Sequence, residues 1–305
     1  MRHLVSLSDV SADEIARIFS ITEDLKSKFA YGLREPLLPG RVLALLFEKQ
    51  SLRTRVSFEA GIAHLGGSSV MLGEEAGFGK RESVADFARV LSEMVDVIVV
   101  RARSHATVVQ IAAHSACSVV NGLTDLAHPC QVLSDLFTLQ EHCGRLAGIR
   151  LAWVGDGNNV AQSLVQGCGH LGVRLAVCTP PGYELASKFL TDAAREFPAL
   201  DLTTTHDPQE AVRGAAAVYT DVWTSMGQEA EREERKKVFA EYQVNSKLMA
   251  QAARDALFMH CLPAHRGEEV TDEVIDGPQS VVVAQAANRM HVQKGILVWL
   301  LAAQA

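Results

Sequence analysis

Strand-length apolar runs alternate with helix-like segments along the whole chain, and this alternation limits the folds that the chain can adopt. In the first half of the chain the runs are 42–47, 69–72, 96–101 and 118–121. In the second half they are 150–154, 173–178, 201–204, 216–220, 257–260 and 280–283. Strands that alternate with helices are typical of parallel sheets covered on both faces. The sequence therefore predicts an α/β protein with two doubly wound parallel-sheet domains joined by interdomain helices.

The length of 305 residues suits two domains of ordinary size. We expect residues 1–136 to form the first domain and residues 137–285 the second, with the boundary inside a helix that follows residue 131. The C-terminal helix, 286–305, ends in an apolar patch and is expected to pack back on the first domain. An opening helix over 8–29 is predicted, with Ser11 as its N-cap.

Composition and charge narrow the class of partner. The formal net charge of −7 argues against a nucleic-acid surface. The six cysteines show no paired spacing, the first residues lack a signal-peptide pattern, and no apolar run reaches membrane-spanning length. We expect a reduced, cytoplasmic enzyme with no nucleic-acid or membrane partner. The run 229–237 is charged on every side, which indicates a solvated helix without chemistry.

The stretch Ser51-Leu52-Arg53-Thr54-Arg55 joins the first strand to a helix. Ser51 is a good N-cap residue, and a helix N-terminus offers unpaired N–H groups and partial positive charge that hold anions. Two hydroxyls and two guanidinium groups share that turn, so the stretch predicts a phosphate cradle. A capped surface helix with solvated arginines is the alternative that this stretch alone leaves open.

Several polar residues follow strand ends, where doubly wound folds place their ligands. Arg101 ends its strand, and His128 lies after the next one, held extended by Pro129. Asp221 and Cys261 follow strands of the second half. A lone histidine is more often structural than catalytic, and a cysteine is more often a small buried residue. A neutral imidazole, an arginine and a carboxylate–thiol pair at strand ends nevertheless favour an active site.

The sequence Gly155-Asp156-Gly157-Asn158-Asn159-Val160 imitates the dinucleotide fingerprint. Val160 stands where a third small residue belongs, and the next strand ends at Cys178-Thr179 without a ribose-binding acid. We therefore expect no NAD site.

Four motifs occur along the chain in this order: Ser-x-Arg-Thr-Arg at 51–55, His-Pro-Cys-Gln at 128–131, Asp-x-Trp-x-Ser-Met-Gly at 221–227 and His-Cys-Leu-Pro at 260–263. Together they resemble the ornithine carbamoyltransferase family. The resemblance covers essentially the whole chain, as far as Asn288-Arg289-Met290-His291. It implies transfer of a carbamoyl group from carbamoyl phosphate to the δ-amine of L-ornithine, giving citrulline and phosphate, in arginine metabolism. Biosynthesis is the expected direction, and the sequence alone leaves degradation open.

By this resemblance, the carbamoyl phosphate site comprises Ser51, Leu52, Arg53, Thr54, Arg101, His128, Gln131, Cys261, Leu262 and Arg289. The ornithine site comprises Asn159, Asp221, Ser225 and Met226, and the catalytic residues are Arg101, His128, Asp221 and Cys261. His128 is expected to contact the carbamoyl oxygen, while Asp221 and Cys261 hold the side-chain amine. Cys261 is expected to receive or relay the amine proton rather than attack covalently. No histidine–cysteine spacing suggests zinc, and we expect neither a metal nor a cofactor.

The chain departs from the family pattern at two positions. Leu52 replaces a threonine at a position that contributes mainly a backbone N–H. Gly77 stands where many relatives place a glutamine that reaches a neighbouring subunit, and Lys80 is a candidate substitute. The resemblance implies a homotrimer or a multiple of it.

Two other functions remain open at this point. One is a carbamoyltransferase for another amine, such as N-acetylornithine or aspartate, although Ser225-Met226-Gly227 favours a free α-amino acid. The other is a non-catalytic metabolite-binding or regulatory subunit. An assay of citrulline formation with each amine distinguishes a carbamoyltransferase for another amine from ornithine transfer. Binding of substrates without product formation would indicate the non-catalytic subunit.

Overall fold

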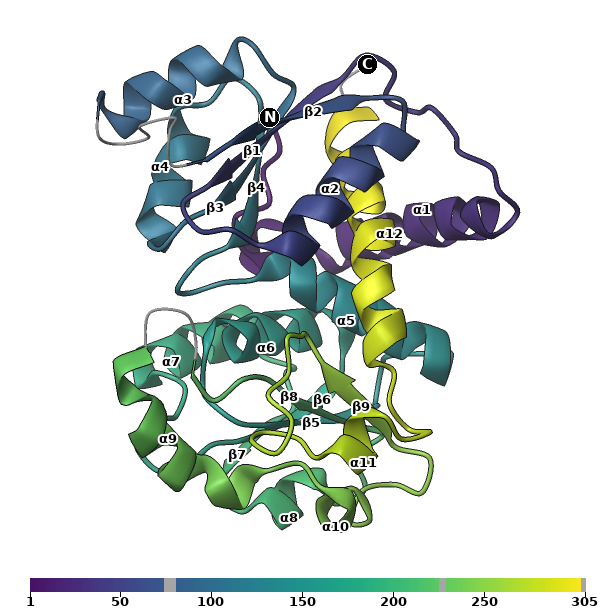
Figure 1. Cartoon of the computed structure of the whole chain (residues 1–305), viewed down its shortest axis with the longest axis vertical. Helices are drawn as coiled ribbons and strands as arrows, with labels where there is room; N and C mark the ends of the chain where they lie inside the picture. Colours follow the sequence, from purple (N-terminus) through teal and green to yellow (C-terminus); the bar gives the residue numbers. More distant parts are fainter. Residues whose placement is uncertain (74–80, 225–228, 303–305) are drawn as a thin grey trace. The chain divides into compact units, whose positions relative to one another are not determined.

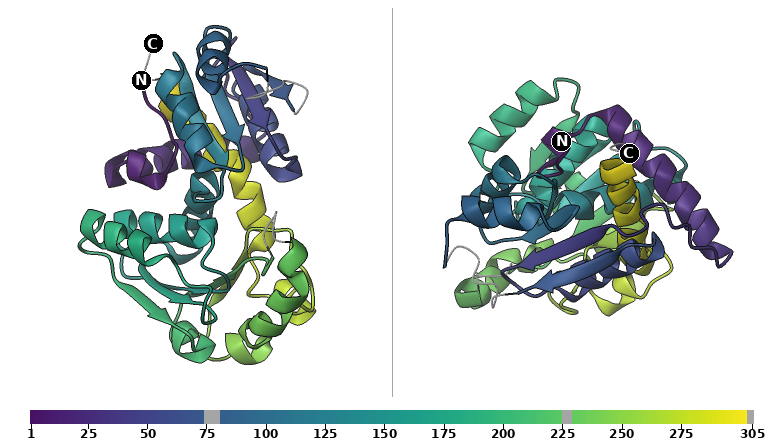
Figure 2. Two further views of the ribbon diagram at one scale, coloured as in Figure 1. Left: turned by 90° about the vertical axis from the view of Figure 1, so that its left-hand side faces the viewer. Right: turned by 90° about the horizontal axis from the view of Figure 1, so that it is seen from above.

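The computed structural model describes residues 1–73, 81–224 and 229–302. The chain divides into two compact units, which Figures 1 and 2 show. Unit 1 comprises residues 1–134 and 287–305, and unit 2 comprises residues 135–286. The assignment of substrates to the domains 1–136 and 137–285 stays a prediction.

Unit 1 contains a parallel sheet in the order β2-β1-β3-β4. Its strands are β1 (Val42–Phe47), β2 (Ser68–Leu72), β3 (Val97–Arg101) and β4 (Ser118–Leu123). Its helices are α1 (Ala12–Ala30), α2 (Leu52–His64), α3 (Val84–Ser92), α4 (His105–His114) and parts of α5 (Pro129–Cys143) and α12 (Val282–Leu301), with a 3-10 turn at Leu7–Asp9. Side chains from alternate positions of β1 and β3 pack with α3 and α4 in one apolar core.

Unit 2 contains a parallel sheet in the order β7-β6-β5-β8-β9. Its strands are β5 (Arg150–Val154), β6 (Arg174–Cys178), β7 (Leu202–Thr205), β8 (Ala217–Thr220) and β9 (Leu257–His260). Its helices are α6 (Asn159–Leu171), α7 (Ser187–Glu196), α8 (Pro208–Val212), α9 (Arg232–Phe239), α10 (Ser246–Met249) and α11 (Asp272–Ile275), with 3-10 turns at Glu229–Glu231 and Ala240–Tyr242. The predicted fold class, two parallel α/β sheets with helices on both sides, is confirmed.

Local signals explain where several helices begin and end. Ser11 caps α1 in a capping box: its hydroxyl accepts the N–H of Glu14 at 3.2 Å, and the Glu14 carboxylate accepts the N–H of Ser11 at 3.0 Å. Gly172 ends α6 at φ 65°, a left-handed conformation that favours glycine. The predicted opening helix is therefore confirmed, although it begins after a separate 3-10 turn.

The predicted strand over 280–283 is wrong. Ser280 forms only an isolated bridge with Phe258, and α12 already begins at Val282. The β-branched residues Val281–Val283 suggested a strand, but the helix that follows incorporates two of them. Tertiary packing has overridden a local propensity.

Two further findings concern the whole sequence. Each of the six cysteines, all within the described residues, is a free thiol. None of the helices among the described residues combines the length and apolar character that crossing a bilayer needs.

Candidate active site

Three neighbouring strands of unit 1 bring predicted site residues to one edge of their sheet. Phe47 at the end of β1 lies opposite Arg101, and Arg101 at the end of β3 lies opposite Leu123 of β4. The loop before α2 follows β1, and the loop before α5 follows β4. The carboxyl ends of adjacent parallel strands thus place the 51–54 loop, Arg101 and the start of α5 together.

The first turn of α2 is tied to the C-terminal helix. Thr54 is fully buried, and its hydroxyl oxygen accepts hydrogen bonds from the Ser51 hydroxyl at 3.0 Å and from Nη2 of Arg289 at 2.7 Å. Ser51 occupies the N-cap position as predicted, but its side chain does not cap the backbone, because it bonds to Thr54 instead. The side chain of Ser51 therefore leaves the N–H groups of this turn to another acceptor.

Buried positive charge dominates this edge of unit 1. Arg101, His128 and Arg289 are 7%, 5% and 3% exposed. Burial, and then the charge of Arg289, lower the pKa of Arg101 to about 10. Burial and both arginines hold the pKa of His128 well below its usual range, so the imidazole is neutral near pH 7. Two like charges in a buried site favour an anion between them, and the neutral imidazole can contact a polar, uncharged group.

The other residues of the predicted cradle differ in exposure. Gln131, in the first turn of α5, is buried, and Arg53 is half-buried. The Leu52 side chain is 76% exposed, as suits a residue expected to contribute its backbone. Arg55 is exposed and pairs with Glu59 at 3.2 Å on the surface of α2. The solvated-arginine alternative therefore holds for Arg55.

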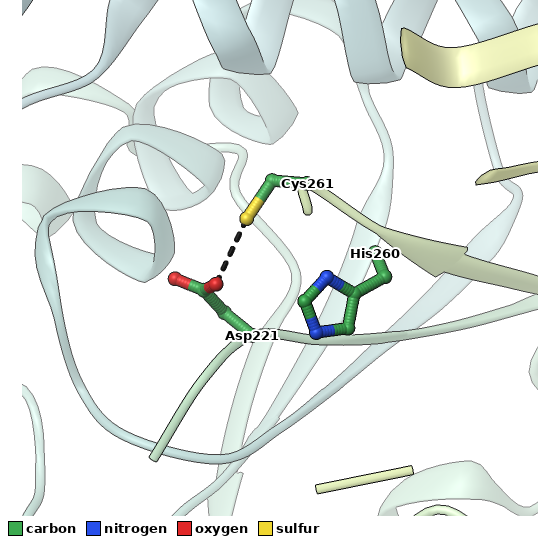
Figure 3. A group of neighbouring side chains, drawn as sticks. All are labelled: Asp221, His260 and Cys261. Atoms are coloured by element: carbon green, nitrogen blue, oxygen red, sulfur yellow. Dashed lines mark hydrogen bonds between the residues drawn. The ribbon is translucent and has the colours of Figure 1, made fainter. Parts of the chain in front are cut away.

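In unit 2, neighbouring strands bring Asp221 and Cys261 together. β8 lies between β5 and β9, with Thr220 opposite His260. Asp221 and Cys261 are the residues that directly follow this pair. The Cys261 thiol donates a hydrogen bond to Oδ1 of Asp221 at 2.9 Å, as Figure 3 shows.

The protonation of Cys261 follows from this geometry. Burial, and then the charge of Asp221 and its hydrogen bond, raise the pKa of the thiol well above its usual range. The thiol is therefore protonated and acts as a donor toward Asp221. A proton that reached this thiol would have to pass to another acceptor, and the carboxylate of Asp221 is the adjacent one.

Asn158 supports the same carboxylate and was not among the predicted site residues. Its Nδ2 donates to Oδ2 of Asp221 at 3.0 Å, while its Oδ1 caps α6 by accepting the N–H groups of Val160 and Ala161. Asn159, the predicted ornithine contact, is the first residue of α6. Of the two adjacent asparagines, Asn158 therefore orients Asp221, and Asn159 begins the helix.

His260 fixes the backbone on the other side of Cys261. Its Nδ1 accepts the N–H of Leu262 at 2.8 Å, so the ring proton of the neutral form lies on Nε2, which faces Oε1 of the fully buried Glu269 at 3.2 Å. Leu262 adopts φ 57°, a left-handed conformation that is unfavourable for a leucine. The buried His260–Glu269 pair therefore holds a strained turn directly after Cys261.

A second buried carboxylate lies behind this turn. Asp135 is 1% exposed and accepts hydrogen bonds from the Tyr219 hydroxyl at 2.8 Å and from Nε2 of Gln285 at 2.7 Å. Oε1 of Gln285 accepts the N–H of His260 at 2.9 Å. Asp135 is thereby connected through Gln285 to the backbone of His260.

Replacing Tyr219 with phenylalanine is expected to destabilise the protein, because a buried carboxylate loses one of its donors. The loss should amount to about 1.5–3 kcal/mol in the free energy of unfolding, measured by urea denaturation. Tyr242→Phe is the matched control, since the Tyr242 hydroxyl donates to the neutral carbonyl of His206 at 2.9 Å. A Tyr219→Phe variant no less stable than Tyr242→Phe would contradict this interpretation.

Two clusters in unit 2 place possible metal ligands within 4.8 Å of one another: Asp221 with His260 and Cys261, and His265 with Glu268 and Glu269. In the first, both nitrogens of His260 and the thiol proton already serve hydrogen bonds. In the second, Glu268 pairs with Arg232 and Lys236, each at 2.9 Å. These contacts compete with a metal ion at both clusters.

The prediction that residues 229–237 form a solvated helix is wrong for one residue. Arg235 on α9 is 5% exposed and pairs with Asp156 at 2.9 Å, while it also donates to the carbonyl oxygen of Trp223 at 2.9 Å. The sequence alone does not distinguish Arg235 from the other residues of α9, because charged residues surround it on all sides. Arg235 joins α9 to the end of β5.

The glycine-rich turn after β5 also has a structural use. A Cβ atom at Gly157 would lie 2.6 Å from the carbonyl carbon of Glu184, and the Gly157 N–H donates to the carbonyl oxygen of Tyr183 at 2.9 Å. The close approach that a dinucleotide fingerprint reserves for a pyrophosphate is taken here by the backbone of the protein itself.

Three predicted residues, Lys80, Ser225 and Met226, lie outside the described residues. Among the others, the sequence missed Asn158, His260, Glu269 and Asp135 as neighbours of the site. His260 adjoins Cys261 in the sequence, and that adjacency was the only signal that could have identified it.

Comparisons with known proteins cover both units. Residues 2–141 match the aspartate/ornithine carbamoyltransferase family's carbamoyl-P binding domain, and residues 147–300 match its Asp/Orn binding domain. The ornithine carbamoyltransferase of Carboxydothermus hydrogenoformans is 50% identical over 303 residues, which cover 98% of this chain and 97% of that protein. That of Bacillus subtilis is 47% identical, covering 97% of this chain and 92% of that protein.

Solved structures show the same likeness. The ornithine carbamoyltransferase from Pyrococcus furiosus matches with a TM-score of 0.95 and 46% identity, covering 99% of this chain and 97% of that one. The anabolic ornithine carbamoyltransferase from Campylobacter jejuni matches with a TM-score of 0.93 and 33% identity over the full length of both chains.

Proposed function

This chain belongs to the aspartate/ornithine carbamoyltransferase family, and from that premise we propose that it transfers the carbamoyl group of carbamoyl phosphate to the δ-amine of L-ornithine. The products are L-citrulline and phosphate. The observation that carries the choice of an amine substrate is the Asp221–Cys261 pair, with its hydrogen bond of 2.9 Å. A carboxylate attracts the ammonium form of ornithine, and an adjacent thiol can pass on the proton that the amine must lose.

The proposed carbamoyl phosphate site uses the cationic edge of unit 1. Arg53, Arg101 and Arg289 neutralise the phosphate, and the N–H groups at the start of α2 add donors. The neutral His128 and the amide of Gln131 contact the carbamoyl group, and the backbone carbonyl of Leu262 accepts from its nitrogen. These residues stabilise the charge that develops on the carbamoyl oxygen and on the departing phosphate.

The proposed ornithine site uses the strand ends of unit 2. Asp221 and Cys261 hold the δ-amine, while Asn159, Ser225 and Met226 bind the α-amino-acid end. The free δ-amine has a pKa of about 10.4, as in lysine, so the site must remove a proton before the nitrogen can attack. Asp221 accepts that first proton, directly or through Cys261. As the neutral nitrogen bonds to the carbamoyl carbon and the C–O bond to phosphate breaks, the nitrogen loses a second proton, which the departing phosphate takes up.

The test is citrulline formation with each candidate amine. L-ornithine should react with carbamoyl phosphate, and N-acetylornithine and aspartate should not. Product from another amine but none from ornithine would reject the substrate, and binding of both ligands without any product would reject the activity. We further propose that the biosynthetic direction dominates, in keeping with the anabolic relative, and that the cytoplasm is its compartment, in keeping with six free thiols. A catalytic preference for citrulline breakdown would contradict the first of these.

We also propose a homotrimer, or a multiple of it, in which each site lies near a subunit boundary. Apolar side chains exposed on unit 1 support a partner surface: Leu52, Val56 and Val70 are 76%, 51% and 46% exposed. If Lys80 serves the site of a neighbour, mixing inactive Lys80→Ala and Cys261→Ala proteins after dissociation should restore activity, because hybrid assemblies contain a site with both residues intact. Light scattering would give the mass. Confirmed subunit exchange without restored activity would remove Lys80 from this role.

A further inference from the structure

Four basic side chains of unit 1 surround the ring of Phe29, at the end of α1. The guanidinium carbon of Arg34 lies 3.6 Å from the ring centroid, and the ammonium nitrogen of Lys294 lies 5.1 Å from it. The rings of His64 and His291 have their centroids at 5.4 Å and 5.0 Å. We call these five residues the Phe29 cluster. They come from α1 and the segment after it, from α2 and from α12, which Figure 1 shows within this unit.

Lys294 is buried and has no counter-ion among the residues that the structure describes. The residue is 2% exposed, and its aliphatic chain lies against α2, where a Cβ atom at Gly61 would be 3.4 Å from Cγ of Lys294. Its ammonium group forms no hydrogen bond or ion pair with any described residue. Burial, and then the charge of Arg34, lower the pKa of Lys294 to about 8. A buried lysine in this state is costly for the folded protein unless an anion compensates it.

The histidines of the cluster also have unused polar atoms. Nδ1 of His64 and Nδ1 of His291 are buried and form no hydrogen bond within the described residues. Burial and the neighbouring cations, Lys294 foremost, lower the pKa of His291 to about 3. The pKa of His64 falls through burial and the charges of Arg34 and Lys294. Every charged neighbour that shifts the pKa of these histidines is positive. The carboxylates of Asp24 and Glu35 already pair with Lys28 at 2.7 Å and 2.6 Å.

The Phe29 ring does not compensate this charge by itself. A cation–π contact contributes about 0.5–2 kcal/mol, and Arg34 lies closer to the same ring than Lys294 does. Nη1 of Arg34 also donates to the carbonyl oxygens of Phe29 and Leu33, so this residue is held in place beside the ring. The Phe29 cluster offers basic groups on several sides, and no carboxylate in the described part of the chain pairs with them.

We propose that the Phe29 cluster is a binding site for a small oxyanion of the phosphate or sulfate type. Arg34 is exposed, and Phe29 and His64 are partly exposed, so the cluster is open to solvent on that side. A nucleotide fits less well, because Arg34 covers a face of the ring on which a base would stack. A tetrahedral oxyanion accepts hydrogen bonds in several directions, as Lys294, Arg34 and the two imidazoles require.

The test must separate this site from the one proposed for carbamoyl phosphate. The Arg101→Met variant serves as the parent for all proteins compared, because it is expected to weaken phosphate binding at the proposed carbamoyl phosphate site. Lys294→Met is added to the parent because it keeps the length of the side chain and removes its charge. Lys188→Met is the matched control, since the Lys188 side chain is 91% exposed on α7. Titration calorimetry with inorganic phosphate, at matched ionic strength in chloride, gives the affinity.

The parent and the Lys188→Met control should bind phosphate alike, and Lys294→Met should bind it at least tenfold more weakly. Arg34→Gln should also lower the affinity for phosphate. Arg34 is exposed, so this substitution is expected to leave the fold intact. Binding to the parent should also take up protons at pH 8, because an anion raises the pKa of Lys294 among Lys26, Arg34, His64 and His291. Comparing two buffers of different ionisation enthalpy measures that uptake.

Several results would overturn the proposal. Equal phosphate affinity in the parent and in the Lys294→Met variant would place the bound anion elsewhere. No binding by the parent, together with a change of assembled mass in Lys294→Met, would show that a carboxylate of a second copy fills the cluster instead. No binding by the parent and no change of mass would leave the cluster without an anion, which also rejects the proposal.

Discussion

Replacing Asp221 with asparagine is expected to lower kcat by about a hundredfold to ten-thousandfold, the range associated with the loss of a general base. Asparagine keeps the shape and an oxygen that can accept the hydrogen bond of the Cys261 thiol. It loses the negative charge that attracts the ornithine ammonium and the basicity that is needed to take up a proton. Initial rates of citrulline formation give kcat. The affinity for carbamoyl phosphate should change little, because the site proposed for that ligand uses mainly the cations of unit 1.

Cys261→Ser separates the two members of the pair. A serine hydroxyl also donates to Asp221, so the carboxylate stays oriented, but the path of the proton changes. The expected loss in turnover is large yet smaller than for Asp221→Asn, with weaker ornithine binding. Asp201→Asn is the matched control, because Asp201 pairs with Arg174 on the surface at 2.9 Å. An Asp221→Asn enzyme with kcat within threefold of the wild type would reject the assigned base.

Replacing Arg101 with methionine is expected to weaken carbamoyl phosphate binding by about tenfold to a hundredfold, the equivalent of one charge-assisted contact. Burial and the charge of Arg289 lower the pKa of Arg101 to about 10, so an anion bound beside the two arginines relieves their repulsion. Methionine removes the charge and keeps most of the apolar length.

The measurement pairs thermal unfolding with ligand. Carbamoyl phosphate should raise the unfolding temperature of the wild type and of Arg103→Met, an exposed neighbour on the same segment, but it should raise that of Arg101→Met far less. If carbamoyl phosphate raised the unfolding temperature of Arg101→Met as much as that of the wild type, Arg101 would be excluded from the site.

The sequence predicted those residues whose position follows from strand order. Asp221 and Cys261 each come directly after an apolar run, and the ends of neighbouring parallel strands meet at one edge, so their proximity could be expected. Asp135 and Glu269 could not be placed in this way. Each lies inside a helical or loop segment, and its partners, Tyr219 and His260, are identified only by the three-dimensional packing.

The predictions for Arg235 and for the segment 280–283 were wrong for opposite reasons. Arg235 lies among charged neighbours, and a charge pattern does not tell which member turns inward to meet Asp156. The valines near 282 have a high strand propensity, but they lie at the start of α12, most of which belongs to unit 1. In both places a contact distant in sequence decided the outcome, which local patterns do not contain.

The return of α12 to unit 1 has a consequence for how the protein is made. Unit 2 is one continuous stretch of chain, whereas unit 1 needs residues 287–305 in addition to residues 1–134. On the ribosome, all of unit 2 is synthesised before unit 1 receives its last helix, so the usual order in which the N-terminal domain is completed first is reversed. Until α12 has been synthesised, Thr54 lacks the hydrogen bond from Arg289, and α1 lacks the helix whose Gly295 packs closely against Ile18 and Thr22. The nascent chain therefore completes its proposed phosphate cradle only after the whole of unit 2 has been made.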